Sequence, residues 1–127
     1  MMNLLLVALG GALGASLRYG TYLAIDRYAA GGATMGTLVV NIVGSGLLGA
    51  IVAWFMARDL PGESALWMFL TVGVLGAFTT FSAFSRETVH MINTGDMTRA
   101  VIYALANVVL SVGAYLAVWH IVRRVVS

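Results

Sequence analysis

The segment that decides the fold is Gly73-Val74-Leu75-Gly76-Ala77-Phe78-Thr79-Thr80-Phe81-Ser82-Ala83-Phe84-Ser85. It lies inside an uncharged run, Ser64 to Ser85, that is long enough to cross a bilayer as a helix. Irregular backbone at membrane depth is tolerated only where it lines a cavity or is buried in protein, because lipid cannot satisfy freed N–H and C=O groups. The glycines, paired threonines and spaced phenylalanines therefore predict a transmembrane helix broken near Gly76 to Thr80, with a functional site at the break.

The composition is that of an integral membrane protein. Hydrophobic residues make up 61% of the 127 residues and charged residues 9%, whereas about a quarter of the residues of a soluble domain are charged. Three further runs reach the length of a spanning helix: Leu4 to Ile25, Met35 to Ala57 and Ala100 to Val122. We expect an all-α protein of the cell (inner) membrane, a single membrane domain over residues 1–127, with four spans at about 4–26, 34–57, 64–92 and 98–122.

The arginines carry information on orientation, because cytoplasmic loops normally hold an excess of Lys and Arg. If both termini lie on one side, each side receives three arginines: Arg58, Arg123 and Arg124 beside the termini, and Arg27, Arg86 and Arg99 opposite. Equal numbers favour insertion both ways, so that two oppositely oriented copies pair about an axis in the membrane plane. The alternative is that a weak bias, such as the placement of Arg18, selects one orientation. No basic cluster is large enough to indicate a nucleic-acid partner, and no protein cofactor is implied.

Polar residues recur inside the predicted spans. Tyr103, Asn107 and Ser111 are spaced by four and share one helix face. The other spans contribute Asn41, and Ser82 and Ser85 beside Phe81 and Phe84. Residues of this kind need a partner and often face an aqueous path; with no acid among them, such a lining suits an anion. Hydrogen bonding between helices is the alternative role for the polar residues.

The phenylalanine pair and the predicted break each allow two interpretations. Phe81 and Phe84 either pack against lipid or a neighbouring helix, or present their positive ring edges to a small anion.

Gly76 and Ala77 permit an unwound turn, and Thr79 or Thr80 can cap a new half-helix beginning near Phe81. The freed carbonyls from Gly76 to Thr79 suit a hard cation such as Na⁺, unless the threonines bond back to the preceding turn and only bend the helix.

Three blocks of the sequence resemble the signatures of the CrcB/Fluc fluoride channel family: Gly10 to Tyr19 (GGALGASLRY), Gly36 to Gly44 (GTLVVNIVG) and Gly73 through Thr88. They span three of the four predicted helices in the right order, and the chain length fits as well. Three positions depart from the family pattern. Ala77 stands where a second glycine is common, Gly46 where phenylalanine is frequent, and Asn107 where serine is more usual.

The resemblance implies a dual-topology antiparallel homodimer in the lipid bilayer. It would export toxic fluoride passively through two pores, each built from both subunits, around a central structural sodium ion. Carried over by position, the resemblance implies a fluoride pore lined by Asn41, Phe81, Phe84, Ser82, Ser85, Tyr103, Asn107 and Ser111. It also implies that the backbone carbonyls of Gly76 and Thr79 hold the sodium. Arg18 and Thr80 would have vestibule or structural roles.

Two other functions remain open. A small four-helix, proton-coupled cation or drug exporter needs a titratable acid within a span, whereas all five acids fall at or near predicted helix ends: Asp26, Asp59, Glu63, Glu87 and Asp96. Glu87, in particular, is expected to be solvated or to lie on a vestibule rim. A non-transporting membrane assembly subunit would use its polar stripes only to hold helices together. We do not expect an enzyme, because His90 and His120 are isolated and no catalytic group gathers around them.

Overall fold

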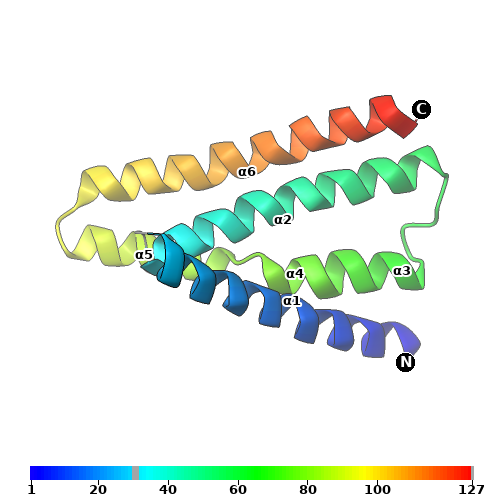
Figure 1. The fold of residues 1–127 in the computed structure, drawn as a ribbon, viewed down its shortest axis with the longest axis horizontal. Helices are drawn as coiled ribbons and strands as arrows, with labels where there is room; N and C mark the ends of the chain where they lie inside the picture. Colours follow the sequence, from blue (N-terminus) through cyan, green and yellow to red (C-terminus); the bar gives the residue numbers. More distant parts are fainter. Residues whose placement is uncertain (30–31, 127) are drawn as a thin grey trace.

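The computed structural model describes residues 1–29 and 32–126. Four long helical segments run roughly side by side, with both chain ends at the same end of the bundle (Figure 1). Three of them are continuous: α1 (Met2–Tyr28), α2 (Gly32–Ala57) and α6 (Met97–Val126). All four are long and apolar enough to cross a membrane. The expected all-α architecture with four long apolar helices is confirmed.

The third segment is built from several pieces in sequence: α3 (Ala65–Trp67), η1 (Met68–Leu75), α4 (Gly76–Phe78) and α5 (Phe81–Asn93). The piece η1 is π-helical, and the Gly76 N–H accordingly donates to the carbonyl of Thr71, five residues earlier. Between α4 and α5, Thr79 and Thr80 have extended backbone, with ψ of 158° and 116°. The predicted break of the third helix is thereby confirmed, whereas the π-helical stretch ahead of it was not expected from the sequence.

The break lies later in the chain than the glycine suggested. Gly76 and Ala77, which permit an unwound turn, do not unwind, because Gly76 is helical (φ −61°, ψ −36°) and the helix continues to Phe78. The extended residues Thr79 and Thr80 are the last two of the predicted range Gly76 to Thr80. The Thr79 N–H still bonds to the Leu75 carbonyl at 3.0 Å. The chain leaves the helix only where the Thr80 N–H turns to Asn41 of α2. Glycine permits an unwound turn but does not require one.

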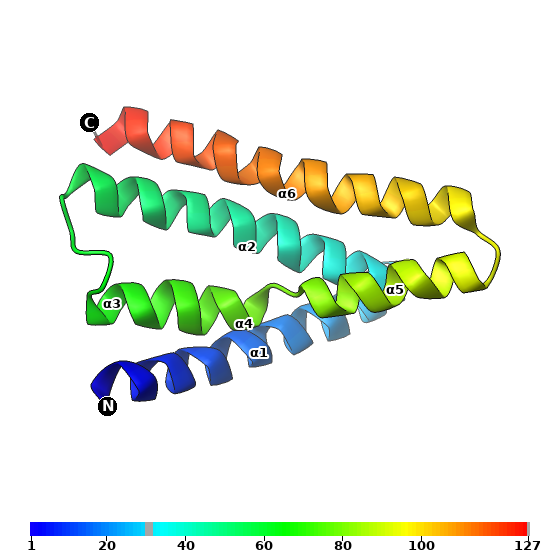
Figure 2. The same ribbon diagram turned by 180° about the vertical axis from the view of Figure 1, so that it is seen from behind.

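Two pairs of neighbouring segments make up the bundle. Helix α6 lies along α2, and α1 lies along η1 and α4, in both views (Figures 1 and 2). The second contact depends on small residues: a Cβ at Gly10 would stand 2.6 Å from the Phe69 carbonyl oxygen, and one at Gly14 would collide with the Val74 carbonyl. Gly11, by contrast, has nothing within 4 Å. The spacing of four between Gly10 and Gly14 therefore serves close helix approach.

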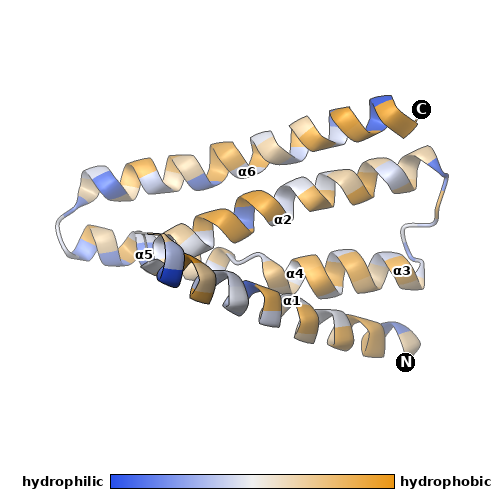
Figure 3. Ribbon diagram, in the orientation of Figure 1, coloured by the Kyte–Doolittle hydropathy of each residue, from blue (hydrophilic) through white to orange (hydrophobic). Residues whose placement is uncertain are grey.

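The exterior of the bundle is apolar. Apolar colour dominates the four segments and hydrophilic colour gathers near their ends and in the loops (Figure 3). Large hydrophobic side chains are exposed along every long helix, for example Leu17, Leu47, Val72 and Val109. Such a surface is stable in lipid or against another protein, because neither requires hydrogen bonds from it.

Candidate functional site

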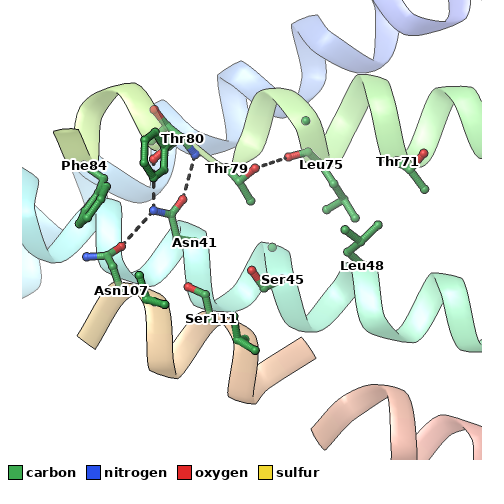
Figure 4. A pocket seen from close by; sticks show the side chains of 15 residues that line it. Asn41, Ser45, Leu48, Thr71, Leu75, Thr79, Thr80, Phe84, Asn107 and Ser111 are labelled. Carbon is green, nitrogen blue, oxygen red and sulfur yellow. Dashed lines mark hydrogen bonds between the residues drawn. The ribbon is translucent and has the colours of Figure 1, made fainter. Parts of the chain in front are cut away.

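The break in the third segment is held by one side chain of α2. Asn41 Oδ1 accepts from the Thr80 N–H at 2.9 Å, and Asn41 Nδ2 donates to the Thr80 carbonyl at 3.2 Å (Figure 4). A single amide thus satisfies both backbone groups of Thr80, which have left the helix and would be costly to leave unpaired. The Thr80 hydroxyl accepts from the Ala83 N–H at 3.1 Å and so caps α5. The expectation that a threonine caps the second half-helix is confirmed for Thr80.

The same amide reaches the fourth span. Asn41 Nδ2 also donates to Asn107 Oδ1 at 3.0 Å, and Asn107 Nδ2 donates to the Tyr103 carbonyl at 3.3 Å. Asn41 and Asn107 point toward each other across the gap between α2 and α6 (Figure 4). The two residues therefore join three segments, which is the helix-linking role considered for them from the sequence. Asn41 and Asn107 also line a cavity, so the helix-linking role and a pore-lining role are compatible.

A cavity of about 380 Å³ lies beside the break. Its polar lining comes from three of the four segments: Asn41, Ser45, Thr71, Thr79, Thr80, Asn107 and Ser111. The Ser111 hydroxyl is buried and has no hydrogen-bond partner within the described residues. Buried polar groups are nearly always paired, so an unpaired hydroxyl on a cavity wall calls for a bound polar ligand, ion or water. The sequence pattern does not assign Ser45 or Thr71 to a pore, because neither belongs to the polar stripe of α6.

The predicted phenylalanine pair forms on α5. The ring centroids of Phe81 and Phe84 are 5.2 Å apart with an interplanar angle of 53°, and Phe84 also lies 5.6 Å from the Tyr103 ring. Both phenylalanines line the cavity. Phe84 is partly covered, whereas 77% of Phe81 is exposed. The pair therefore forms one apolar wall, and the ring of Phe81 lies on the exterior of the chain.

The other predicted pore residues lie apart from this cavity. Ser82 meets the Thr80 hydroxyl at 3.2 Å, and Ser85 bonds back to the Phe81 carbonyl at 2.9 Å. Neither of these serines, nor Tyr103, is part of the cavity lining. Tyr103 is buried nearer the start of α6, where its hydroxyl donates to the Glu87 carboxylate. Of the predicted stripe on α6, Asn107 and Ser111 are therefore the members that line the cavity.

Glu87 differs most from the sequence-based expectation. Only 7% of it is exposed, and its carboxylate accepts from the Thr37 hydroxyl at 3.0 Å and from the Tyr103 hydroxyl at 2.6 Å. Tyr22 of α1 meets the Thr37 hydroxyl at 2.9 Å and extends the network to a further helix. The expectation of a solvated helix end is wrong, because α5 continues to Asn93 and turns position 87 toward α2 and α6.

The spacing within α5 could have indicated this burial. Phe84, Glu87 and Met91 recur at intervals of three and four and so share one helix face. Phe84 packs against the buried cluster that contains Met91 and Tyr103. An acid at a core position of an amphipathic helix predicts buried partners for its carboxylate, which here are two hydroxyls.

Arg18 of α1 contacts the break on the side opposite Asn41 of α2. Its Nη1 donates to the Thr79 carbonyl at 3.3 Å, so a cationic group already approaches one of the two carbonyls predicted to bind sodium. The Thr79 hydroxyl bonds back to the Leu75 carbonyl at 2.9 Å. Threonine back-bonding, considered as an alternative for this pair, is thus observed at Thr79. Thr80 instead caps the next helix.

Comparison with known proteins identifies the family. The family described as "CrcB-like protein, Camphor Resistance (CrcB)" matches residues 5–119. The chain belongs to this family. A "Fluoride-specific ion channel FluC" of Hyphomonas neptunium is 43% identical over 126 residues, which is 98% of each chain. Proteins of the same name from Granulibacter bethesdensis and Caulobacter sp. (strain K31) are each 42% identical over 127 residues, covering 98% and 99% of those proteins. The resemblance of this CrcB chain to the fluoride channel family is confirmed, as is the expectation that it is not an enzyme.

Proposed function

We propose that this CrcB protein is a fluoride-selective channel that passively exports cytoplasmic fluoride. The observation that carries the proposal is the cavity beside the helix break. Its donors are uncharged and one of them, the Ser111 hydroxyl, has no protein partner within the described residues. Relatives that match nearly the whole chain are named as fluoride-specific channels.

The chemistry of the lining suits fluoride. A channel must replace the water shell of its ion while binding the ion weakly enough to release it. The hydroxyl of Ser111 and the amides of Asn107 and Asn41 offer neutral donors, and the ring edges of Phe81 and Phe84 add weak positive potential. The Asn41 amide already holds Thr80 and Asn107, so Asn41 would donate to the ion by exchanging one of these bonds. Ser82, Ser85 and Tyr103 complete the pore in this proposal.

We infer that the working unit is an antiparallel dual-topology homodimer with two pores. Phe81 projects from its subunit, and Val108 and Val112, which line the cavity, are both more than half exposed. A second copy would cover these groups and close the cavity. The three arginines assigned to each side favour no orientation, which supports insertion both ways. Accessibility of a terminal tag from both sides of the membrane tests this part of the proposal, and single-sided labelling would contradict it.

A structural sodium ion at the dimer centre would find its ligands at the break. The Thr80 N–H, which would bond to the Gly76 carbonyl in a continuous helix, bonds to Asn41 instead. The Thr79 carbonyl receives the Arg18 guanidinium and retains a second lone pair. These carbonyls are the hard oxygen donors that sodium prefers at the end of a discontinuous helix. We therefore propose that Gly76 and Thr79 hold a sodium ion, which would fix the ends of the half-helices.

Efflux from liposomes tests the function. Liposomes that contain the purified protein and equal potassium fluoride and potassium chloride should release fluoride rapidly and retain chloride once valinomycin lets potassium leave with the anion. Equal release of both halides, or retention of both, would contradict the proposal. The buried Glu87 is an acid of the kind that a proton-coupled exporter needs, so the same assay should include an imposed pH gradient at zero membrane potential. Fluoride accumulation driven by that gradient in proteoliposomes, beyond that in protein-free liposomes, would favour coupled transport over a channel.

A further inference from the structure

A second cavity, of about 500 Å³, lies at the end of the bundle opposite the chain termini. It is enclosed by the start of α2, the second half of α5 and the start of α6, which meet at the left of Figure 1. Three of its lining residues are basic, Arg86, His90 and Arg99, and two are acidic, Glu87 and Asp96. None of the three lines the cavity at the helix break, so the basic cavity is a separate feature of the molecule.

The acids that line the basic cavity are engaged within the protein. Asp96 Oδ1 accepts from the backbone N–H of Arg99 at 3.1 Å and so caps the start of α6. The Glu87 carboxylate is held by two hydroxyls, and Arg86 approaches it only to 3.6 Å, with 74% of the Arg86 side chain exposed. Across residues 1–29 and 32–126, no carboxylate oxygen lies within 4.0 Å of the Arg99 guanidinium. The Arg99 guanidinium is therefore available to an external anion, and the exposed Arg86, which has only a long contact with Glu87, can contribute a second cationic group.

An apolar groove of about 330 Å³ continues from the basic cavity along α2 and α6. The two share Thr34, Met91 and Arg99 in their linings. The further walls of the groove include Met35, Leu38, Ile102 and Ala106. Ile102 is 62% and Met35 40% exposed, so the groove opens on the apolar exterior of the subunit.

We propose that the basic cavity and the apolar groove together bind one anionic phospholipid. The phosphate would lie between Arg86 and Arg99, and the first part of an acyl chain would follow the groove past Ile102. Basic pockets between transmembrane helices are suited to anionic headgroups, and long arginine side chains can reach the headgroup region from a helix end. A free phosphate or a fluoride ion would use the cationic groups but not the groove. The continuity of the two features favours a lipid, and the site is independent of the proposed ion conduction.

Lipid binding to the full chain in detergent tests the proposal. Binding of phosphatidylglycerol and phosphatidylcholine with identical acyl chains is compared by native mass spectrometry. We expect selective binding of phosphatidylglycerol. The double substitution Arg86→Ala and Arg99→Ala should weaken that binding about 30-fold, the effect of two basic residues at a membrane surface. The matched control is Arg58→Ala with Arg124→Ala, which removes the same charge at the other end and should leave the binding unchanged.

A groove-filling variant and competition with small anions distinguish lipid binding from the binding of other ligands. Ala106→Phe fills the groove without changing charge and should also weaken phosphatidylglycerol binding, while helix content by circular dichroism stays that of the wild type. Equal binding of the two lipids, or equal loss in the control variant, would overturn the proposal. Inorganic phosphate or fluoride that displaces the lipid at millimolar concentration would instead assign the cavity to a small anion and would also overturn it.

Discussion

The two halves of the broken third segment are held in different ways. The first half, from Ala65 to Phe78, packs against α1 through close backbone contacts at glycines. The second half, α5, is held to α2 and α6 through Thr80 and Glu87, whose side-chain and backbone groups form hydrogen bonds to both helices. The break therefore separates a half that is held by backbone packing from a half that is held by side-chain hydrogen bonds. Asn41 joins the two because it pairs the backbone groups released between them.

The largest effect is expected where the first half meets α1. Gly14→Ala would place a methyl group against the Val74 carbonyl oxygen, and neither backbone can move without disturbing its helix. We expect a loss of about 3 kcal/mol or more of unfolding free energy. The measurement is unfolding in detergent. Gly11→Ala is the control, because its Cβ meets nothing within 4 Å; equal destabilisation of the two variants would show that the backbone contact does not hold this half.

The next effect is expected at the junction of the halves. Asn41→Ala would leave the Thr80 N–H and carbonyl unpaired, at a cost of about 1–3 kcal/mol for each group that water cannot reach. Fluoride efflux should fall together with stability, because the position of α5 depends on this amide. Asn93→Ala, at the exposed end of α5, serves as the control. Stability at the wild-type level for Asn41→Ala would mean that the amide does not hold the break.

A smaller effect is expected within the second half. Glu87→Gln keeps the size of the side chain but replaces one acceptor oxygen by a donor that would face the hydroxyl of Thr37 or Tyr103. We expect a loss of about 1–3 kcal/mol, measured by the same unfolding assay. Glu63→Gln, at an exposed position, should be neutral. If the two substitutions had equal effects, the buried network would not contribute to holding α5.

The smallest effect on stability, and the most informative on function, is expected at Ser111. Its hydroxyl has no partner within the described residues, so Ser111→Ala breaks no hydrogen bond in the protein and should not lower the unfolding free energy. Fluoride efflux should nevertheless fall, because the cavity loses a donor for the ion. Ser16→Ala, which removes an exposed hydroxyl on α1, should leave efflux unchanged. Unchanged efflux in Ser111→Ala would remove this hydroxyl from the pore.

Much of the fold was predictable because the hydrophobic runs specify spans directly. The break was predictable to within the range Gly76 to Thr80, but the sequence did not show that only the last two residues of this range leave the helix. Glycine at position 76 only permits unwinding. The helix ends where the Thr80 N–H bonds to Asn41, which lies on another helix. The π-helical stretch gave no sequence signal that we recognised. It lies beside α1, where Gly10 and Gly73 are in close contact.

The candidate site was predictable only in part. Residues on a single helix, such as Asn107 and Ser111, could be grouped by their spacing. Ser45 and Thr71 reach the same cavity from separate helices, and no local pattern connects them. A charged residue such as Glu87 in an apolar chain usually indicates the end of a spanning helix. The burial of Glu87 instead depends on hydroxyls from two other helices, which the local sequence does not show.

In the proposed channel, an anion passes beside the break, along the phenylalanines of α5. The most direct test is fluoride efflux from liposomes with wild-type protein and with Phe84→Ile, using a fluoride electrode and a parallel chloride measurement. We predict rapid, chloride-excluding efflux for the wild type, and its loss in Phe84→Ile with an unchanged elution volume. Wild-type efflux in the variant, or chloride release equal to fluoride release in the wild type, would contradict the account.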